Sequence, residues 1–345
     1  MRLGILTGGG DCPGLNAVIR AAVARTLRTY DGHLLGFKDG WRGLLTNRVV
    51  ELDLNVVAGI LPRGGTMLGT SRVDPLREHG GLETMRRAFE LHDLDGLLVC
   101  GGDGTLSAAL QVSEAGLPVI GIPKTIDNDV PGTDYSFGFD TALSTVVHAV
   151  DALHTTAESH DRVIVVEVMG RTAGWLALCS GIAGGADVVV APEEPLSVEQ
   201  VCSLLRHRIA RGRDFSIVVV AEGARFEPDP DGRTLEIPTR VDPFGRPRFG
   251  GIGDVLARRI EETIGVEART VQLGYVQRGG TPTAFDRLLG TRMGVMAVDL
   301  AARGEWGRMV SLHGLEVHAV TLDVVRQGPR PCARGIVDVA KVFFG

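Results

Sequence analysis

A short polar segment carries the side chains best suited to proton transfer. Residues 123–129, with the sequence PKTIDND, directly follow the apolar run Val119–Ile122. An extended backbone would place Thr125, Asp127 and Asp129 on one side of the chain. Two carboxylates this close repel each other, so the pKa of one of them rises unless a cation offsets the charge. Such a group can act as general base for a hydroxyl nucleophile, worth roughly 10²–10⁴-fold in rate. A solvated turn is the alternative, and the apolar run before the segment argues against it.

Two glycine-rich turns have the composition of phosphate-binding loops. Residues 7–14 (TGGGDCPG) follow the apolar run Leu3–Leu6, and residues 101–105 (GGDGT) follow Leu97–Cys100. Without Cβ atoms, main-chain N–H groups can point at phosphate oxygens, which the N-terminus of a following helix also attracts. Asp103 in the second turn has the hard oxygen ligands that Mg²⁺ prefers. Neither turn has the Walker A or dinucleotide-binding spacing. A tight turn without ligand, and an N-cap role for Asp103, therefore stay open.

Arginines beside glycines could neutralise the charge of a phosphate group. Arg171 ends the segment EVMGR, and Arg278 lies within residues 274–280 (GYVQRGG). In phosphoryl transfer such an arginine can contribute roughly 10³–10⁵-fold in rate. Of the 36 lysines and arginines, however, only Lys38, Lys124 and Lys341 are lysines. An arginine alone is weak evidence in this chain, and Lys124 counts for more.

Alternating strands and helices must position these segments. Short apolar runs bounded by glycine, proline or aspartate predict buried strands, and helical spacing of apolar residues predicts helices between them. This alternation indicates parallel sheets covered on both faces, with ligands at the carboxyl ends of the strands. The predicted strands are Leu3–Leu6, Leu97–Cys100, Val119–Ile122, Val163–Val168, Val188–Val190 and Ile217–Ala221; the predicted helices are Leu15–Arg28, Thr105–Glu114, Val198–Arg211, Ile252–Ile264, Ala284–Ala302 and one with Asp140 as its N-cap.

The composition excludes several classes of protein. Glycine makes up 47 of 345 residues without a Gly-X-Y period, so the chain is not collagen-like. The net charge of −6 and the lack of a basic run give no basis for nucleic-acid binding. No 18-residue apolar run or signal peptide is present, and five cysteines form no CxxC pair, so we expect a cytoplasmic protein. The proline-rich residues 226–250 are expected to form a surface insertion, with a hairpin as one option.

The ordered set of motifs closely resembles the 6-phosphofructokinases. The matching blocks run from residue 4 to about 292 and read GGGDCPGLN, GGDGT, PKTIDND, GTDYSFGF, EVMGR, AEGA and VQRGGTP. The resemblance implies a kinase that uses Mg²⁺ and transfers the γ-phosphoryl group of ATP to the 1-hydroxyl of fructose 6-phosphate. It also implies a homo-oligomer, dimer or tetramer, without a nucleic-acid or membrane partner.

The resemblance also implies the fold and the domains. It predicts an α/β protein with two Rossmann-like three-layer α/β domains, parallel-rich sheets and an active-site cleft between the domains. Residues 1–138 plus 277–320 are expected to form the nucleotide-binding domain, and residues 139–276 plus 321–345 the sugar-phosphate-binding domain.

Individual roles follow from the resemblance, residue by residue. Asp127 would take the proton of the sugar 1-hydroxyl, flanked by Thr125 and Asp129, and Arg171 would stabilise the transferring phosphoryl group. Asp103 would hold Mg²⁺. Arg162, Arg269 and Arg278 would clamp the 6-phosphate, the first two reaching it from a neighbouring subunit. The nucleotide contacts are Gly10, Arg72, Val73, Gly102, Asp103, Gly104 and Thr105; the sugar-phosphate contacts are Thr125, Ile126, Asp127, Arg162, Met169, Gly170, Arg171, Glu222, Arg269, Tyr275, Val276, Gln277 and Arg278.

Two positions bear on the phosphoryl donor. Gly104 leaves room for an adenosine nucleotide, whereas pyrophosphate-using relatives place aspartate there. Lys124 is the residue that those pyrophosphate enzymes carry, where most ATP users have glycine. The combination resembles a mixed actinobacterial-type subgroup, and we favour ATP because a carboxylate at position 104 would repel the α-phosphate. Tyr275 stands where many bacterial members have histidine. The alternatives are a pyrophosphate-dependent fructose-6-phosphate 1-phosphotransferase, a kinase for NAD or lipid, and a non-catalytic sensor of nucleotides or sugar phosphates.

Overall fold

The computed structural model describes residues 1–235, 240–241, 247–248 and 250–344. Contacts between residues divide the chain into two compact units, and the chain passes from one to the other three times. Unit 1 comprises Met1–Thr141 and Arg278–Arg330, and unit 2 comprises Ala142–Gln277 and Pro331–Gly345.

Unit 1 is built on a mixed sheet of seven strands in the order β13-β12-β5-β4-β1-β2-β3. Its five inner strands run parallel, while β3 and β13 pair antiparallel at the two edges. The inner strands β1, β4 and β5 are apolar and almost wholly buried, as strands covered on both faces must be. The bounds are β1 Arg2–Thr7, β2 His33–Phe37, β3 Val49–Leu52, β4 Gly96–Gly101, β5 Val119–Pro123, β12 Arg308–His313 and β13 Glu316–Thr321.

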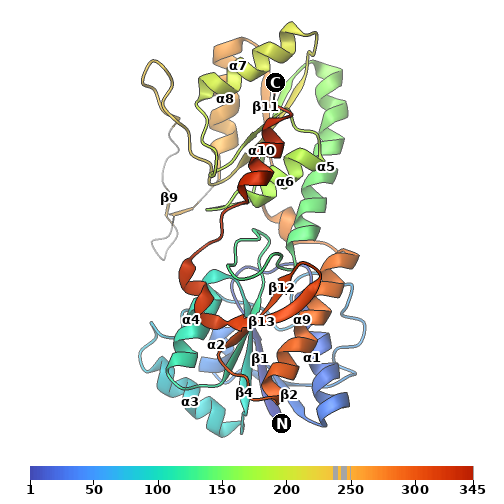
Figure 1. The fold of residues 1–345 in the computed structure, drawn as a ribbon, viewed down its shortest axis with the longest axis vertical. Helices are drawn as coiled ribbons and strands as arrows, with labels where there is room; N and C mark the ends of the chain where they lie inside the picture. Colours follow the sequence, from blue (N-terminus) through green and yellow to red (C-terminus); the bar gives the residue numbers. More distant parts are fainter. Residues whose placement is uncertain (236–239, 242–246, 249, 345) are drawn as a thin grey trace. The chain divides into compact units, whose positions relative to one another are not determined.

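Helices cover both faces of this sheet (Figure 1). On one face α1 and α9 pack against each other, and glycine makes their close approach possible. A Cβ at Gly294 would lie 2.6 Å from the carbonyl oxygen of Val18 on the facing helix. The other face carries an apolar core that includes Trp41, Phe89 and Leu106. The bounds are α1 Leu15–Tyr30, α2 Trp41–Leu45, α3 Gly81–Leu91, α4 Asp103–Glu114, α9 Ala284–Ala302 and the short 3₁₀ helix η2 Leu322–Gln327.

Unit 2 contains a four-stranded parallel sheet in the order β11-β6-β8-β7. Valine-rich strands β6, β7 and β8 are buried along their whole length. Helix α8 packs on β6 and β11, and α6 packs on β7 and β8. The bounds are α5 Phe139–His160, which begins in unit 1, β6 Val163–Val168, α6 Trp175–Ala183, β7 Val188–Val190, α7 Val198–Ala210, β8 Ser216–Ala221, α8 Ile252–Ile264, β11 Ala268–Gln272, the 3₁₀ helix η1 Gly274–Arg278 and α10 Arg334–Lys341.

The predicted insertion at residues 226–250 lies partly outside the described residues. Within the part that is described, β9 (Arg240–Val241) pairs antiparallel with β10 (Pro247–Arg248). Throughout the described part of the chain, no helix has both the length and the apolar character that crossing a bilayer requires.

The expected α/β architecture is confirmed, and every strand predicted from an apolar run is present. The N-cap prediction at Asp140 is wrong, because α5 begins one residue earlier, at Phe139. Strands β2, β3, β11, β12 and β13 were not predicted. Of these, β3, β11 and β13 are edge strands, in which polar and apolar residues mix. The helices α2, α3 and α10 and the 3₁₀ helices η1 and η2 were also missed.

The N-termini of α5 and α9 are joined by side-chain hydrogen bonds within unit 1. Asp286 of α9 is fully buried, and its carboxylate accepts hydrogen bonds from the backbone N–H (2.8 Å) and the hydroxyl (2.5 Å) of Thr141. In return, Thr283 donates its hydroxyl to the Asp140 carboxylate at 2.6 Å. Burial raises the pKa of Asp286 to about 6, although its hydrogen bonds lower it. The Thr141 hydroxyl also accepts the backbone N–H of Thr283 at 3.0 Å, so each helix start supplies a side-chain acceptor to a backbone N–H of the other.

We expect the Asp286→Asn variant to change how stability depends on pH. The pKa of Asp286 lies near 6 in the folded protein against an ordinary value of 3.8. The folded state therefore binds this proton more tightly, and the resulting stabilisation is present below pH 4 and is lost as the pH rises through 6. Each pKa unit corresponds to about 1.4 kcal/mol, so the native chain should lose up to about 3 kcal/mol relative to the variant between pH 4 and 7. Urea unfolding of both proteins across this range measures the difference, and a constant difference would contradict the assignment.

Candidate active site

The polar segment after β5 forms an ordered loop in unit 1. Asn128 has a left-handed backbone conformation (φ 51°), which asparagine tolerates better than most residues. Its side-chain oxygen accepts the backbone N–H of Ser136 at 3.0 Å, and the Ser136 hydroxyl donates to the carbonyl of Thr125 at 2.9 Å. The backbone N–H of Asp127 donates to the Thr125 hydroxyl at 3.0 Å. The two ends of the loop are thus tied together on either side of the carboxyl groups.

The carboxyl groups of this loop influence each other. The pKa of Asp129 is raised to about 6, first by burial and then by the negative charge of Asp127, with a smaller contribution from Asp103. A hydrogen bond from Thr125 lowers it. Burial also raises the pKa of Asp103. The predicted rise in one carboxyl pKa is therefore found at Asp129, and Asp103 lies close enough to act on the same pair. Ile126 is fully buried, so only its main chain can face a ligand.

The first glycine turn offers fewer amide groups to a ligand than its sequence suggests. The N–H of Gly8 donates to the carbonyl of Cys100 at 2.9 Å, and the N–H of Gly9 donates to that of Ser71 at 3.0 Å. A Cβ at Gly8 would lie 2.7 Å from the Thr105 side chain. Both of these N–H groups are therefore used within the fold. At Gly8 the missing Cβ makes room for Thr105.

Two cations flank Gly10. Lys124 is 3 % exposed, and its ammonium group donates a hydrogen bond to the Gly10 carbonyl. The Arg278 guanidinium donates to the carbonyl of Asp11 at 3.3 Å and occupies the space that a Cβ at Gly10 would need. Arg278 was predicted from the resemblance as a ligand of the sugar 6-phosphate, and in unit 1 it lies against the first glycine turn. The two groups give this turn a positive charge that suits an anion.

The second turn leads directly into α4. Gly102 is the N-cap, Asp103 is the first helical residue and Gly104 is the second. The first N–H groups of a helix have no partner within the helix and attract phosphate. A Cβ at Gly104 would meet no atom within 4 Å. The helix start therefore has unfilled space beside it.

A cavity of about 420 Å³ lies beside Val73 in unit 1. Val73 was predicted to contact the nucleotide, and Arg72 next to it is exposed. The other lining residues were missed, because they come from α2 and from the start of α3, where no motif marks them. They are Arg42, Leu45, Thr46, Glu78, His79, Gly81 and Thr84.

In unit 2, the predicted sugar-binding residues gather at the carboxyl end of β6. Gly170 has a φ of 134°, and a Cβ there would lie 2.8 Å from the carbonyl oxygen of Ala173, so the position requires glycine. The backbone N–H of Met169 donates to the side chain of Gln277 at 3.1 Å, and that of Glu222 donates to the Val168 carbonyl at 2.8 Å. Arg171 follows directly and is exposed. Met169, Gly170, Glu222 and Gln277 are therefore neighbours.

Sequence reasoning missed Glu167, a 2 % exposed carboxylate within the valine-rich strand β6. It accepts the backbone N–H groups of Gly251 and Gly253, both at 2.9 Å, and the Gln272 side-chain amide at 3.1 Å. These bonds join the start of α8 to the end of β11. The signal was available in the sequence, since a buried charge in an apolar strand needs partners.

Arg162 and Arg269 lie near the amino-terminal ends of β6 and β11, whereas Gly170 follows the carboxyl end of β6. Arg162 directly precedes β6 and donates to Glu267 at 2.7 Å. Arg269 pairs with Glu267 as well and contacts Glu261 at 3.4 Å. The six residues of β6, at about 3.3 Å each, place about 20 Å between these arginines and Gly170. Within one chain they are not brought together with the residues that follow β6.

Tyr275 and Val276, both predicted as sugar-phosphate contacts, project outward from η1. Their side chains are 78 % and 61 % exposed, whereas that of their neighbour Gln277 is fully buried. Gln277 uses its amide to donate to the Gly274 carbonyl at 3.0 Å. Its side chain is thus engaged within unit 2.

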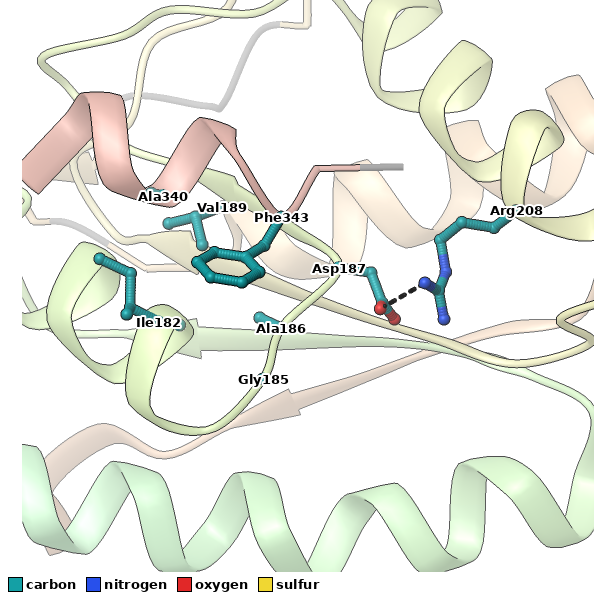
Figure 2. A pocket seen from close by; sticks show the side chains of 9 residues that line it. Ile182, Gly185, Ala186, Asp187, Val189, Arg208, Ala340 and Phe343 are labelled. Carbon is teal, nitrogen blue, oxygen red and sulfur yellow. Dashed lines mark ion pairs between the residues drawn. The ribbon is translucent and has the colours of Figure 1, made fainter.

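A second cavity, of about 300 Å³, lies elsewhere in unit 2 and contains none of the predicted residues. Figure 2 shows Phe343 facing Ile182 and Val189 across it, with the ion pair between Asp187 and Arg208 (2.9 Å) at one side. Burial raises the pKa of Asp187, and its bond with the backbone N–H of Ile217 lowers it.

Comparisons with known proteins agree with the motifs. Residues 2–301 match the family described as phosphofructokinase. The chain is 50 % identical to an ATP-dependent 6-phosphofructokinase of Mycobacterium leprae and 49 % identical to a pyrophosphate–fructose 6-phosphate 1-phosphotransferase of Streptomyces coelicolor, in each case over 100 % of both chains. Among solved structures, the phosphofructokinase of Pichia pastoris in the T-state superposes with a TM-score of 0.82 at 33 % identity, covering 99 % of this chain and 36 % of the yeast chain. Relatives named for either donor are thus equally similar.

We expect the Asp127→Asn variant to lower the pKa of Asp129. The negative charge of Asp127 is the second-largest cause of the raised pKa, and removing it leaves burial as the main cause. The pKa should therefore fall but stay above the ordinary value of 3.8. Carbon-13 NMR titration of labelled aspartate carboxyl groups measures it, with the resonance assigned by its loss in Asp129→Asn. Asp134→Asn, an exposed change in the same loop, is the control. An Asp129 pKa that is equal in the native and Asp127→Asn proteins would refute the interaction.

Proposed function

The chain belongs to the phosphofructokinase family, and we propose that it transfers the γ-phosphoryl group of ATP to the 1-hydroxyl of fructose 6-phosphate. The products would be fructose 1,6-bisphosphate and ADP. The observation that carries the proposal is the group of three carboxyls, Asp103, Asp127 and Asp129, next to a glycine turn flanked by Lys124 and Arg278. This arrangement supports the proposal, because a carboxylate that could accept a proton would then lie close to a positively charged turn that could bind phosphate.

Asp127 is proposed as the general base that takes the proton of the 1-hydroxyl. Asp129 acts on Asp127 through the repulsion between the two carboxyl groups. Thr125 acts on it through its hydroxyl, which accepts the backbone N–H of Asp127. Arg171 is proposed to stabilise the charge on the phosphoryl group in transit, a role that its exposed position after Gly170 allows. Since phosphoryl transfer depends on positioning and charge neutralisation, fixed loops contribute as much as any single side chain.

The Asp127→Ser variant should lose turnover while still binding fructose 6-phosphate. Loss of a general base costs roughly 10²–10⁴-fold in rate, whereas affinity for the sugar phosphate depends on other groups. Steady-state assays measure turnover, and isothermal titration with fructose 6-phosphate measures binding. The exposed Asp134→Ser variant is the matched control. A folded Asp127→Ser protein with near-native turnover would remove the base assignment.

The choice of ATP as donor rests on two features of unit 1. The cavity of about 420 Å³ beside Val73 has the size of a small-molecule site, and pyrophosphate has no group that would fill it. Gly104 on the first turn of α4 has open space around it, which leaves room for the α-phosphate. Both features favour a nucleotide.

The residues present fit a magnesium ion that arrives with the nucleotide. Among the described residues no cluster of three or more His, Cys, Asp or Glu side chains could hold a metal ion. A Mg²⁺ ion bound to substrate phosphates needs only one or two protein carboxylates. Asp103 at the start of α4 would be such a ligand, and the ion would supply neutralisation of the phosphate charge. Asp103 therefore remains the proposed metal contact.

Pyrophosphate is the second candidate donor, and the observation that favours it is Lys124. Its ammonium group is buried against the first turn, where it would attract the phosphates of either donor. The relative from Streptomyces coelicolor named for pyrophosphate is as similar to this chain as the ATP-dependent one. A charge at this place does not discriminate between two anions of similar chemistry. The space at Gly104 and beside Val73 supports ATP as the donor.

We expect the Gly104→Asp variant to fold normally and to lose activity with ATP. The new carboxylate meets open space, so stability should not change. It would stand near the nucleotide phosphates, and repulsion of about 1–4 kcal/mol at 4 Å corresponds to roughly a 5- to 1,000-fold loss in kcat/KM for ATP.

The control is Gly335→Asp, also at the second position of a helix (α10) and also facing open space. Assays of the native chain and both variants with ATP and with pyrophosphate decide the donor. Efficient turnover of the native chain with pyrophosphate and none with ATP would reverse the choice.

A homo-oligomer is proposed because Arg162 and Arg269 lie at the amino-terminal ends of β6 and β11, at the opposite end of these strands from Gly170. A second copy of the chain could receive them at its 6-phosphate site, which their own copy does not allow. Glu267 holds the two guanidinium groups side by side. A cytoplasmic location is proposed from the five cysteines, none of which forms a disulfide within the part of the chain that the structure describes.

A further inference from the structure

Arg330, at the end of unit 1, makes three hydrogen bonds to the main chain of the loop that carries Asp127 and Asp129. Its backbone N–H donates to the carbonyl of Asp129 at 2.7 Å. One nitrogen of its guanidinium donates to the carbonyls of Asn128 at 3.0 Å and Asp134 at 2.9 Å. No motif in the sequence pointed to this residue. It is separated from the loop by about 200 residues of chain.

These bonds fix the orientation of Asp129. The carbonyl of Asn128 belongs to the peptide group before Asp129, and the carbonyl of Asp129 belongs to the peptide group after it. Since both peptide planes are held by the same residue, φ and ψ of Asp129 are set, and with them the direction of its Cα–Cβ bond. The third bond, to Asp134, joins the two ends of the turn, where the Asn128 side chain also donates at 3.3 Å.

Arg330 is itself held in place by its neighbours in the sequence. It stands between Pro329 and Pro331, and the preceding Gly328 has a φ of 74°. Proline fixes its own φ and restricts the residue before it to extended conformations. The backbone at Arg330 is therefore restricted before it meets the loop, so little entropy is lost when its bonds form.

We propose that Arg330 is a positioning residue for phosphoryl transfer, which holds the Asp129 carboxyl in a fixed relation to Asp127. The inference rests on the proposed function of Asp127 as general base. Arg330 contacts main-chain carbonyls of the loop and acts on the reaction through them. A misplacement of about 1 Å at a reacting group can cost about 100-fold in rate. Arg330 limits such movement because it holds the peptide groups on both sides of Asp129.

The test compares Arg330→Gln with Arg326→Gln. Arg326 lies four residues earlier, is 61 % exposed and pairs with Glu114 on the surface, so it is a matched control. For Arg330→Gln we expect kcat to fall about 10- to 100-fold, with both substrate KM values within about threefold of native. Arg330→Lys keeps the positive charge but lacks the planar guanidinium group, so its kcat should lie between that of the native chain and that of Arg330→Gln. Thermal unfolding shows whether each variant is folded.

A double-mutant cycle separates positioning from general destabilisation. If Arg330 acts through Asp129, adding Arg330→Gln to an Asp129→Asn protein should produce little further loss of kcat. Full additivity of the two losses, or a kcat for Arg330→Gln equal to that of the control, would overturn the inference. If Arg330→Gln does not fold, a native kcat in Arg330→Lys would overturn it instead. Native turnover in Asp127→Ser, by contrast, would refute the base assignment independently of Arg330.

Discussion

The repulsion between two partly buried carboxyl groups, Asp127 and Asp129, is the constraint on which unit 1 depends. Burial and like charge together raise the pKa of Asp129 to about 6, and a flexible loop would relieve the strain by turning one carboxyl into water. The loop is prevented from doing so by bonds at several points, from Asn128 and Ser136 within it and from Arg330 outside it. The hydrogen bonds that hold the loop are therefore a requirement of the charges it carries.

Contacts within the fold also account for the glycines of the first turn. Glycine-rich turns suggest amide groups open to phosphate, but Gly8 and Gly9 use theirs within the fold. What the absent side chains provide is room for other groups, for Thr105 at Gly8 and for the Arg278 guanidinium at Gly10. The positive charge of the turn therefore comes largely from Lys124 and Arg278. A glycine motif can mark a phosphate site even where its amides are already occupied.

The sequence predicted the parallel strands β1, β4, β5, β6, β7 and β8 and the helices α1, α4, α5, α7, α8 and α9, because buried parallel strands and amphipathic helices have strong periodic patterns. It did not predict the edge strand β13 or the residues around the cavity beside Val73, since His79 and Thr84 belong to no pattern. It predicted the carboxyl pair at Asp127 and Asp129 from local spacing alone. Glu167 and Arg330 were missed for a physical reason: their partners lie far away in sequence, and only the folded chain brings them together.

Strand β6 separates two arginines that are close in sequence. Arg162 and Arg171 are nine positions apart, and the resemblance assigns both to one sugar phosphate. The strand between them is buried along its whole length and holds the two arginines beyond its opposite ends. The pairing of Arg162 with Glu267 fixes it at the amino-terminal end. In the proposed assembly, each chain would give Arg171 to its own site and Arg162 to a neighbour's, and the length of β6 between the two residues is the structural argument for that proposal.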